Sequence, residues 1–156
     1  MFKVKTEAEA AARYGNIQSG KWSGENIWMT LVDMPDYFEK AVINIATGKP
    51  CSRIYMNKDM KEPFLAAIAA VEATGLTKEI KTFYGCWNVR DVRGMAGHPS
   101  LHSWGIAVDF RADEMPLGAK SLFSDEFVKC FTNLGFAWGG NFKRLDCQHF
   151  SLGYEG

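Results

Sequence analysis

The chain has 156 residues, of which 47% are apolar and 13% aromatic, and a mass of 17.5 kDa. This length and composition fit a single domain over residues 1–156 with a sizeable core, and they exclude a disordered chain. The 18 basic and 18 acidic residues balance to a net charge of +0 without an excess of cations in either half, so we expect no nucleic-acid partner.

The first predicted elements are a helix, a loop and a strand. Thr6 and Glu9 form a capping-box pattern that starts the helix, and Gly15 is the expected stop. The polar, glycine-containing segment 21–26 predicts a loop. The segment 27–32 predicts a short strand.

Two further helices are predicted before the middle of the chain. Over residues 35–46, apolar side chains recur at helical spacing, and Gly48 is the expected end. The clearest helical pattern covers residues 63–74. Pro63 suits the first turn of this helix, where its missing N–H costs nothing, and Gly75 follows the last turn.

The second half of the chain adds strands and one more helix. Residues 79–84 predict a strand, and residues 106–111 alternate with the two-residue period of a half-buried strand. Ser124 can cap a further helix. Residues 136–138 are expected to be extended, and residues 146–152 to form a final strand. This mixture of helices and strands favours an α+β fold.

No segment predicts contact with the membrane interior. The longest apolar run, residues 64–71, is far shorter than the roughly 20 residues of a membrane span. The N-terminal lysines are not followed by an apolar segment of the kind that signal peptides contain. We expect neither membrane insertion nor a signal peptide.

The four cysteines (Cys51, Cys86, Cys130 and Cys147) form no CxxC pair. Their spacing therefore gives no support to a zinc ribbon or a thioredoxin-type motif. Buried free thiols are the expected state, because unpaired cysteine behaves as a small apolar core residue. A disulfide between Cys86 and Cys147 is the alternative in an oxidising compartment.

Two of the three histidines, His102 and His149, lie near the acidic residues Asp109 and Asp146. Two imidazoles and one carboxylate suit zinc, whose catalytic sites use three protein ligands and leave a fourth position for water. Asp146 would then be a spare carboxylate where a general base is needed. Because Asp146 and His149 are three positions apart, one of them must lie on a turn or bulge for both to reach one site. His102 and Asp109 are seven positions apart, and Gly105 can supply the bend between them. The spacing permits a metal site without requiring one.

Residues 100–109 resemble the SxHxxGxAxD motif of the M15 family of zinc peptidases, which have a VanY and D-alanyl-D-alanine carboxypeptidase-like fold. The second part of the family signature, an acidic residue three places before a histidine, is similar to Asp146-x-x-His149 followed by Phe150. All five fixed positions of the first motif match: Ser100, His102, Gly105, Ala107 and Asp109.

Weaker similarities lie on both sides of the first motif. Residues 135–140 resemble the glycine-tryptophan segment that precedes the last motif of the family, and residues 84–90 with Arg93-Gly94 resemble the stretch with its active-site arginine. The start of the long helix at residues 57–59 is similar too. Together the resemblance covers roughly residues 55–152. It implies a hedgehog/DD-peptidase-like α+β fold, in which a small antiparallel sheet carries the zinc site and helices pack against it.

The resemblance implies that His102, Asp109 and His149 bind one Zn²⁺ per chain and that Asp146 is the catalytic carboxylate. His98 has no role in this scheme, and we expect it in a loop.

The resemblance also implies which residues contact the substrate. Arg90 would bind the substrate carbonyl or carboxylate, with Arg93 as the alternative. Ser100 would bond near the substrate or hold the His102 loop. Trp138 would form a wall of the cleft or be a plain core aromatic.

The substrates of the family are peptides of the bacterial cell wall. An aspartate rather than a glutamate at position 146 points to endopeptidases such as phage endolysins that cut the L-alanyl-D-glutamate bond. We expect a monomeric endolysin without a separate wall-binding domain, kept in the host cytoplasm until a holin releases it to the periplasmic wall. The alternatives are a D-alanyl-D-alanine carboxypeptidase or wall-remodelling peptidase, and a catalytically silent wall-binding or structural phage module.

Overall fold

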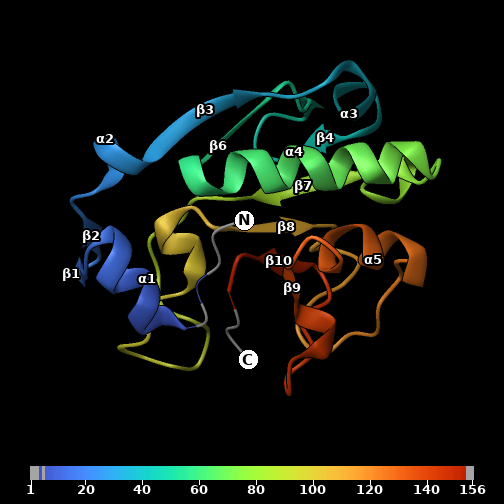
Figure 1. Ribbon diagram of the computed structural model, residues 1–156. Helices are drawn as coiled ribbons and strands as arrows, with labels where there is room; N and C mark the ends of the chain where they lie inside the picture. The colour runs from blue at the N-terminus through green and yellow to red at the C-terminus, as the bar shows by residue number, and fades with distance from the viewer. Residues whose placement is uncertain (1–3, 5, 154–156) are drawn as a thin grey trace.

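The computed structural model describes Val4 and residues 6–153, which form an α+β fold (Figure 1). The fold class therefore agrees with the prediction. Its main sheet has six strands in the order β5-β4-β7-β8-β10-β9, antiparallel except for the parallel pair β4–β7. These strands are β4 (Ile43–Asn44), β5 (Lys49–Pro50), β7 (Thr82–Gly85), β8 (Ala107–Phe110), β9 (Ala137–Trp138) and β10 (His149–Ser151).

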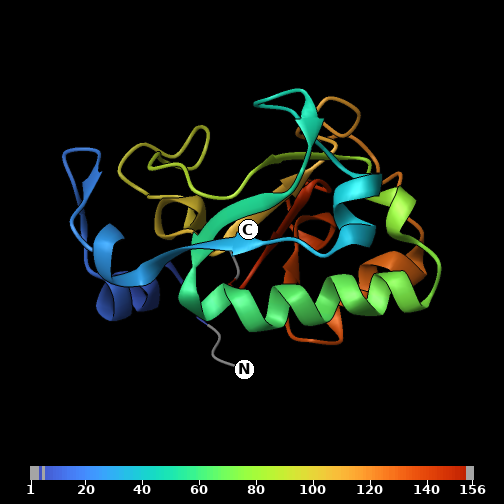
Figure 2. The same ribbon diagram turned by 90° about the horizontal axis from the view of Figure 1, so that it is seen from above.

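The long helix α4 (Lys58–Ala73) runs across the molecule and covers the core on one side of the main sheet (Figures 1 and 2). Phe64 of α4 lies 6.4 Å, ring centre to ring centre, from both Phe110 of β8 and Phe131 of α5 (Asp125–Thr132). The apolar face of α4 therefore packs against the strand that carries Asp109.

Smaller elements complete the fold. A second antiparallel pair, β3 (Met29–Asp33) and β6 (Arg53–Asn57), leads into α4. Helix α1 (Glu7–Tyr14) and the pair β1 (Ile17–Gln18) and β2 (Lys21–Trp22) lie at the opposite end of the molecule from α5 (Figures 1 and 2). The remaining elements are the helices α2 (Glu25–Trp28) and α3 (Asp36–Ala41) and the 3-10 turns η1 (Thr77–Glu79), η2 (Leu101–Trp104) and η3 (Gly139–Asn141).

Two helices begin at the caps that the sequence predicted. Thr6 accepts a hydrogen bond from the Glu9 N–H at the start of α1, and Gly15 follows its last residue. Ser124 accepts from the Phe127 N–H at the start of α5. Both caps satisfy N–H groups that a helix leaves unpaired at its first turn.

The long helix begins earlier than the prediction from residue 63. Asn57 caps it by accepting from the Asp59 N–H, so Pro63 lies inside the helix and not in its first turn. The added residues, 58–62, are mostly polar and long side chains that favour a helix without showing an apolar period. Periodicity alone therefore missed the start.

The prediction of one helix over residues 35–46 was wrong in its second half. Helix α3 ends before Val42, and the chain then pairs with β7 through bonds from the Ile43 N–H to Lys81 O and from the Ile45 N–H to Phe83 O, both 3.1 Å. Pairing with β7 outweighs the weak helical preference of these β-branched residues. Ile45 is consequently 46% exposed instead of facing a helical core.

Several predicted strand boundaries also shift. The expected loop over 21–26 contains strand β2 and the start of α2, and the strand over 27–32 begins at Met29. The first part of 79–84 forms a turn, in which Lys81 has a φ of 60°. Three of the four residues of strand β8 are buried, not half of them as its alternation predicted, and Phe110 packs against Phe64 of α4 and Phe131 of α5.

No helix within Val4 and residues 6–153 combines the length and apolar character that crossing a bilayer would require. All four cysteines are free and buried, as expected. The alternative disulfide between Cys86 and Cys147 is therefore not formed.

Candidate functional site

His102 is held in the short turn η2 by the residues on both sides of it. Ser100 caps the turn by accepting from the His102 N–H at 3.3 Å, and Gly105 ends it with a left-handed φ of 69°. A side chain at Gly105 would begin only 3.0 Å from the backbone nitrogen of Asn57, so the left-handed conformation and this close backbone approach both favour glycine. The predicted bend between His102 and Asp109 is therefore present.

The hydrogen bonds of His102 define which ring nitrogen is free to bind a ligand. Its Nδ1 lies 2.7 Å from the backbone carbonyl oxygen of Cys86, which can only accept. Nδ1 therefore carries a proton, and Nε2 is the ring nitrogen that would bind a metal ion once it is deprotonated. This Nε2 lies 3.1 Å from Asp109 Oδ2, and the His102 side chain is only 4% exposed.

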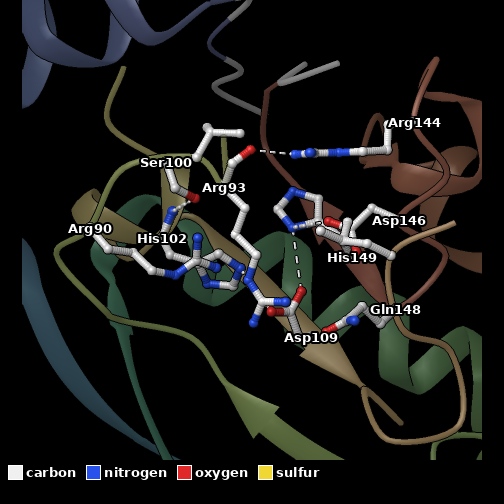
Figure 3. Close-up of a pocket in the computed structure, with 11 residues that line it drawn as sticks. Arg90, Arg93, Ser100, His102, Asp109, Arg144, Asp146, Gln148 and His149 are labelled. Carbon is white, nitrogen blue, oxygen red and sulfur yellow. Dashed lines mark hydrogen bonds and ion pairs between the residues drawn. The ribbon is translucent and has the colours of Figure 1, made fainter. Parts of the chain in front are cut away.

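Asp109 and His149 face each other from neighbouring strands. The two residues are register partners in the antiparallel pair β8–β10. Asp109 Oδ1 lies 3.4 Å from His149 Nδ1, and their side chains are 15% and 1% exposed (Figure 3). The two imidazole rings are 5.2 Å apart between centres. Strand register thus joins residues that are 40 positions apart in the sequence.

These three side chains form a group that could hold a metal ion. One ligand atom from each lies within 4.8 Å of the others. His102 Nε2 and Asp109 Oδ1 are buried without a hydrogen-bond partner among the residues that the structure describes, which is costly unless a ligand completes the site. Burial, the largest single influence, raises the pKa of Asp109, but attraction to His102 and His149 outweighs it and lowers the pKa below its usual range. Two imidazoles and an ionised carboxylate match the donors that zinc binds.

Asp146 lies beside this group at the turn that leads into β10. The His149 N–H donates to Asp146 O at 3.0 Å, which closes the turn that the three-residue spacing predicted. Asp146 Oδ2 is 3.9 Å from His149 Nδ1, and the side chain is 24% exposed. Gly139 accepts from the Asp146 N–H at 2.9 Å, and a side chain at Gly139 would overlap the Asp146 backbone. Gly139 is therefore required for the position of this carboxylate.

Arg90 and Arg93 both line the cavity of about 70 Å³ that contains the three-residue group and Asp146 (Figure 3). The backbone of Arg90 is fixed by the buried Ser103, whose Oγ accepts from the Arg90 N–H at 3.2 Å and donates to Arg90 O at 3.0 Å. Arg93 lies on an exposed loop. Sequence reasoning did not single out Ser103, although it lies next to His102.

Trp138 and His98 both lie outside the lining of this cavity. The Trp138 ring packs on Phe150, and its Nε1 donates to the carbonyl oxygen of Cys147, the residue after Asp146, at 2.9 Å. His98 lies on an exposed loop with Nδ1 2.8 Å from Glu7, away from the other two histidines, as expected.

Two polar side chains that sequence reasoning missed also line the cavity. Arg144 and Gln148 lie on the segment that leads into β10, on either side of Asp146. Their closeness to Asp146 in the sequence is the signal that could have identified them. Gln148 is oriented by a 3.0 Å bond from Nε2 to Met115 O.

The comparison with protein families points to the same segment. Residues 93–152 match a family model described as D-alanyl-D-alanine carboxypeptidase, one of the M15 peptidases. The match covers 60 of the 156 residues. It includes His102, Asp109, Asp146 and His149 and begins after Arg90. No curated protein and no solved structure matches the chain significantly.

Proposed function

We propose that this chain is a zinc-dependent peptidase that hydrolyses stem peptides of peptidoglycan at the L-alanyl-D-glutamate bond. The observation that carries the proposal is the convergence of His102, Asp109 and His149 in one cavity with the spare carboxylate of Asp146. The family match over the same segment supports peptidase activity on the cell wall.

In this proposal His102, Asp109 and His149 hold one zinc ion per chain. The lone pair of His102 Nε2, the carboxylate of Asp109 and Nδ1 of His149 supply the donors. When bound, zinc would act as a Lewis acid and lower the pKa of water from 15.7 to about 7. Cys86 is not one of these three residues: its thiol donates to Gly105 O at 3.4 Å, and burial raises the pKa of that thiol.

Asp146 is the proposed general base and acid. Its carboxylate borders the cavity next to the three-residue group, where it can accept a proton from water and return it to the leaving amine. Arg90, with its backbone fixed by Ser103, is the proposed partner of the substrate carbonyl, where a fixed guanidinium stabilises developing negative charge. Ser100 holds the His102 turn, and Trp138 positions the turn after Asp146.

A D-alanyl-D-alanine carboxypeptidase is the second candidate, and the description of the matching family favours it. Both substrates place a free carboxylate on the D-residue that leaves as the amine. The carboxylate of D-alanine is free because that residue is terminal, and the α-carboxylate of D-glutamate is free because the stem peptide continues through the γ-carboxyl group. The aspartate at position 146 favours the endopeptidase, through the resemblance to that branch. The endolysin role with holin-dependent release, and the monomeric state, belong to the same proposal.

The test is mass spectrometry of the products from purified Gram-negative peptidoglycan, with and without a chelator. The proposal predicts chelator-sensitive release of peptides that begin at D-glutamate and leave L-alanine on the muramyl side. Release of free D-alanine would instead support the carboxypeptidase. Zinc binding without any product would contradict both and support a silent wall-binding module.

A further inference from the structure

The cleft continues past Asp146 into a second, larger cavity. Asp146, Arg93 and Arg144 line both spaces. The second cavity measures about 430 Å³ and presents apolar side chains, including Leu117 and the exposed Met95. The site is therefore open on the side of Asp146 and does not end directly behind it.

Arg144 lies at the junction of the two cavities and spans the gap between two loops. Its Nη2 donates to the backbone carbonyl of Arg93 at 2.6 Å (Figure 3). Its Nη1 faces Gly94, 3.5 Å from where a side chain would begin. The guanidinium thus bridges the two loops, and only one of its donors is used by the described residues.

The charges around the junction are unbalanced. Neither Arg90, Arg93 nor Arg144 forms an ion pair with any carboxylate in the described part of the chain. The two carboxylates of the cavity, Asp109 and Asp146, have roles in the proposed chemistry. A substrate with its own carboxylate would balance these cations, and a held guanidinium suits a carboxylate because two parallel hydrogen bonds can form.

We propose that Arg144 binds the free carboxylate of the substrate residue on the amine side of the scissile bond, and that the second cavity receives the continuing stem peptide. This inference rests on the proposed function, because Asp146 must return its proton to the leaving amine. The leaving side is therefore the side that Asp146 borders, which is the side of Arg144 and the larger cavity. A chain that continues beyond the D-residue needs this open space, whereas a terminal D-alanine does not.

The test measures binding, so that it does not depend on turnover. Asp146→Asn provides a background in which cleavage is blocked and the size of the side chain is kept. The ligands are N-acetyl-L-alanyl-γ-D-glutamyl-L-lysine and the same tripeptide with the glutamyl α-carboxylate replaced by a carboxamide. Calorimetry should give a Kd about 10- to 100-fold lower for the tripeptide with the carboxylate than for the carboxamide, as expected for a charge-assisted hydrogen bond. Adding Arg144→Ala should reduce this preference to about twofold or less, and Arg144→Lys should retain part of it.

Lys120→Ala is the matched control. Lys120 is an exposed cation that lines none of these cavities, next to residues that bond to Leu145 and Cys147 near Asp146. Its loss should leave the preference unchanged. An equal loss in Lys120→Ala, no preference in the background protein, or a preference that survives Arg144→Ala would each overturn the assignment. If the preference depends on Arg144 but the wild-type chain cuts neither peptide, the role of Arg144 stands and the proposed function fails.

Discussion

The cleft has two regions that are built differently. His102, Asp109 and His149, which we call the floor, are 4%, 15% and 1% exposed and are fixed by strand register and a backbone carbonyl. Arg93 and Arg144, the rim, lie on exposed loops joined by one hydrogen bond. Buried side chains that their neighbours hold in place suit chemistry that requires fixed geometry, whereas exposed cations suit recognition of one substrate among several. Substitutions in the floor should therefore affect metal binding and stability, and substitutions in the rim should affect the choice of substrate.

The largest effect is expected from removing a floor histidine. His102→Ala or His149→Ala should lower the zinc content from about one per chain to near zero and abolish hydrolysis. Because a metal that binds only the folded state stabilises it, loss of a site occupied at 1,000 times its Kd costs about 4 kcal/mol, or about 10 °C in Tm. Elemental analysis and thermal unfolding with and without zinc measure both effects.

His98→Ala is the control for the floor histidines. His98 is exposed and bonded to Glu7, so its replacement should leave zinc content and hydrolysis unchanged. Full zinc occupancy with an unchanged Tm in the His102 and His149 variants would show that the floor does not bind the metal.

The next effect separates metal binding from proton transfer. Asp146→Ala should leave the zinc content near one per chain and lower kcat by about 10²- to 10⁴-fold, the usual contribution of a general base. Zinc content and single-substrate kinetics on the same preparation are the required measurements. Loss of zinc in this variant would assign Asp146 to the floor as a ligand.

A smaller effect on activity is expected from Ser103, which joins the turn of His102 to the backbone of Arg90. Ser103→Ala removes both hydrogen bonds to the Arg90 backbone and leaves a partly buried N–H unpaired, at a cost of about 1–3 kcal/mol. Activity should fall while zinc content stays the same, because Arg90 is displaced and the ligands are not. Ser52→Ala, at an exposed serine, is the control. An equal change in Tm and activity in both variants would contradict this link.

The smallest effect lies outside the cleft and depends on pH. Hydrogen bonds from Arg111, and then from Lys81, lower the pKa of Glu114 from its usual 4.5 to about 2. Ionised Glu114 therefore stabilises the folded state above pH 4.5, and this contribution is lost as the pH falls toward 2. Glu114→Gln should lower Tm slightly at pH 7 and not at pH 2, without changing zinc content. A difference in Tm that grows as the pH falls would reverse the sign and contradict the cause.

The sequence predicted the floor better than the rim for physical reasons. His102 and Asp109 belong to a motif in which Gly105 must bend the chain, and the turn before His149 follows from its spacing to Asp146. Arg144 has no such pattern, because its position depends on a contact with a loop about fifty residues earlier. The predicted end of α3 was wrong for the same reason, because the following strand β4 pairs with β7 through a long-range contact.

The most direct test of the account is X-ray absorption at the zinc edge of the reconstituted protein. The account predicts only nitrogen and oxygen neighbours at about 2.0–2.2 Å. Asp146→Ala should leave this pattern unchanged, and His102→Ala should remove the bound zinc. A sulfur neighbour at about 2.3 Å would assign the metal to a cysteine and contradict the floor of His102, Asp109 and His149.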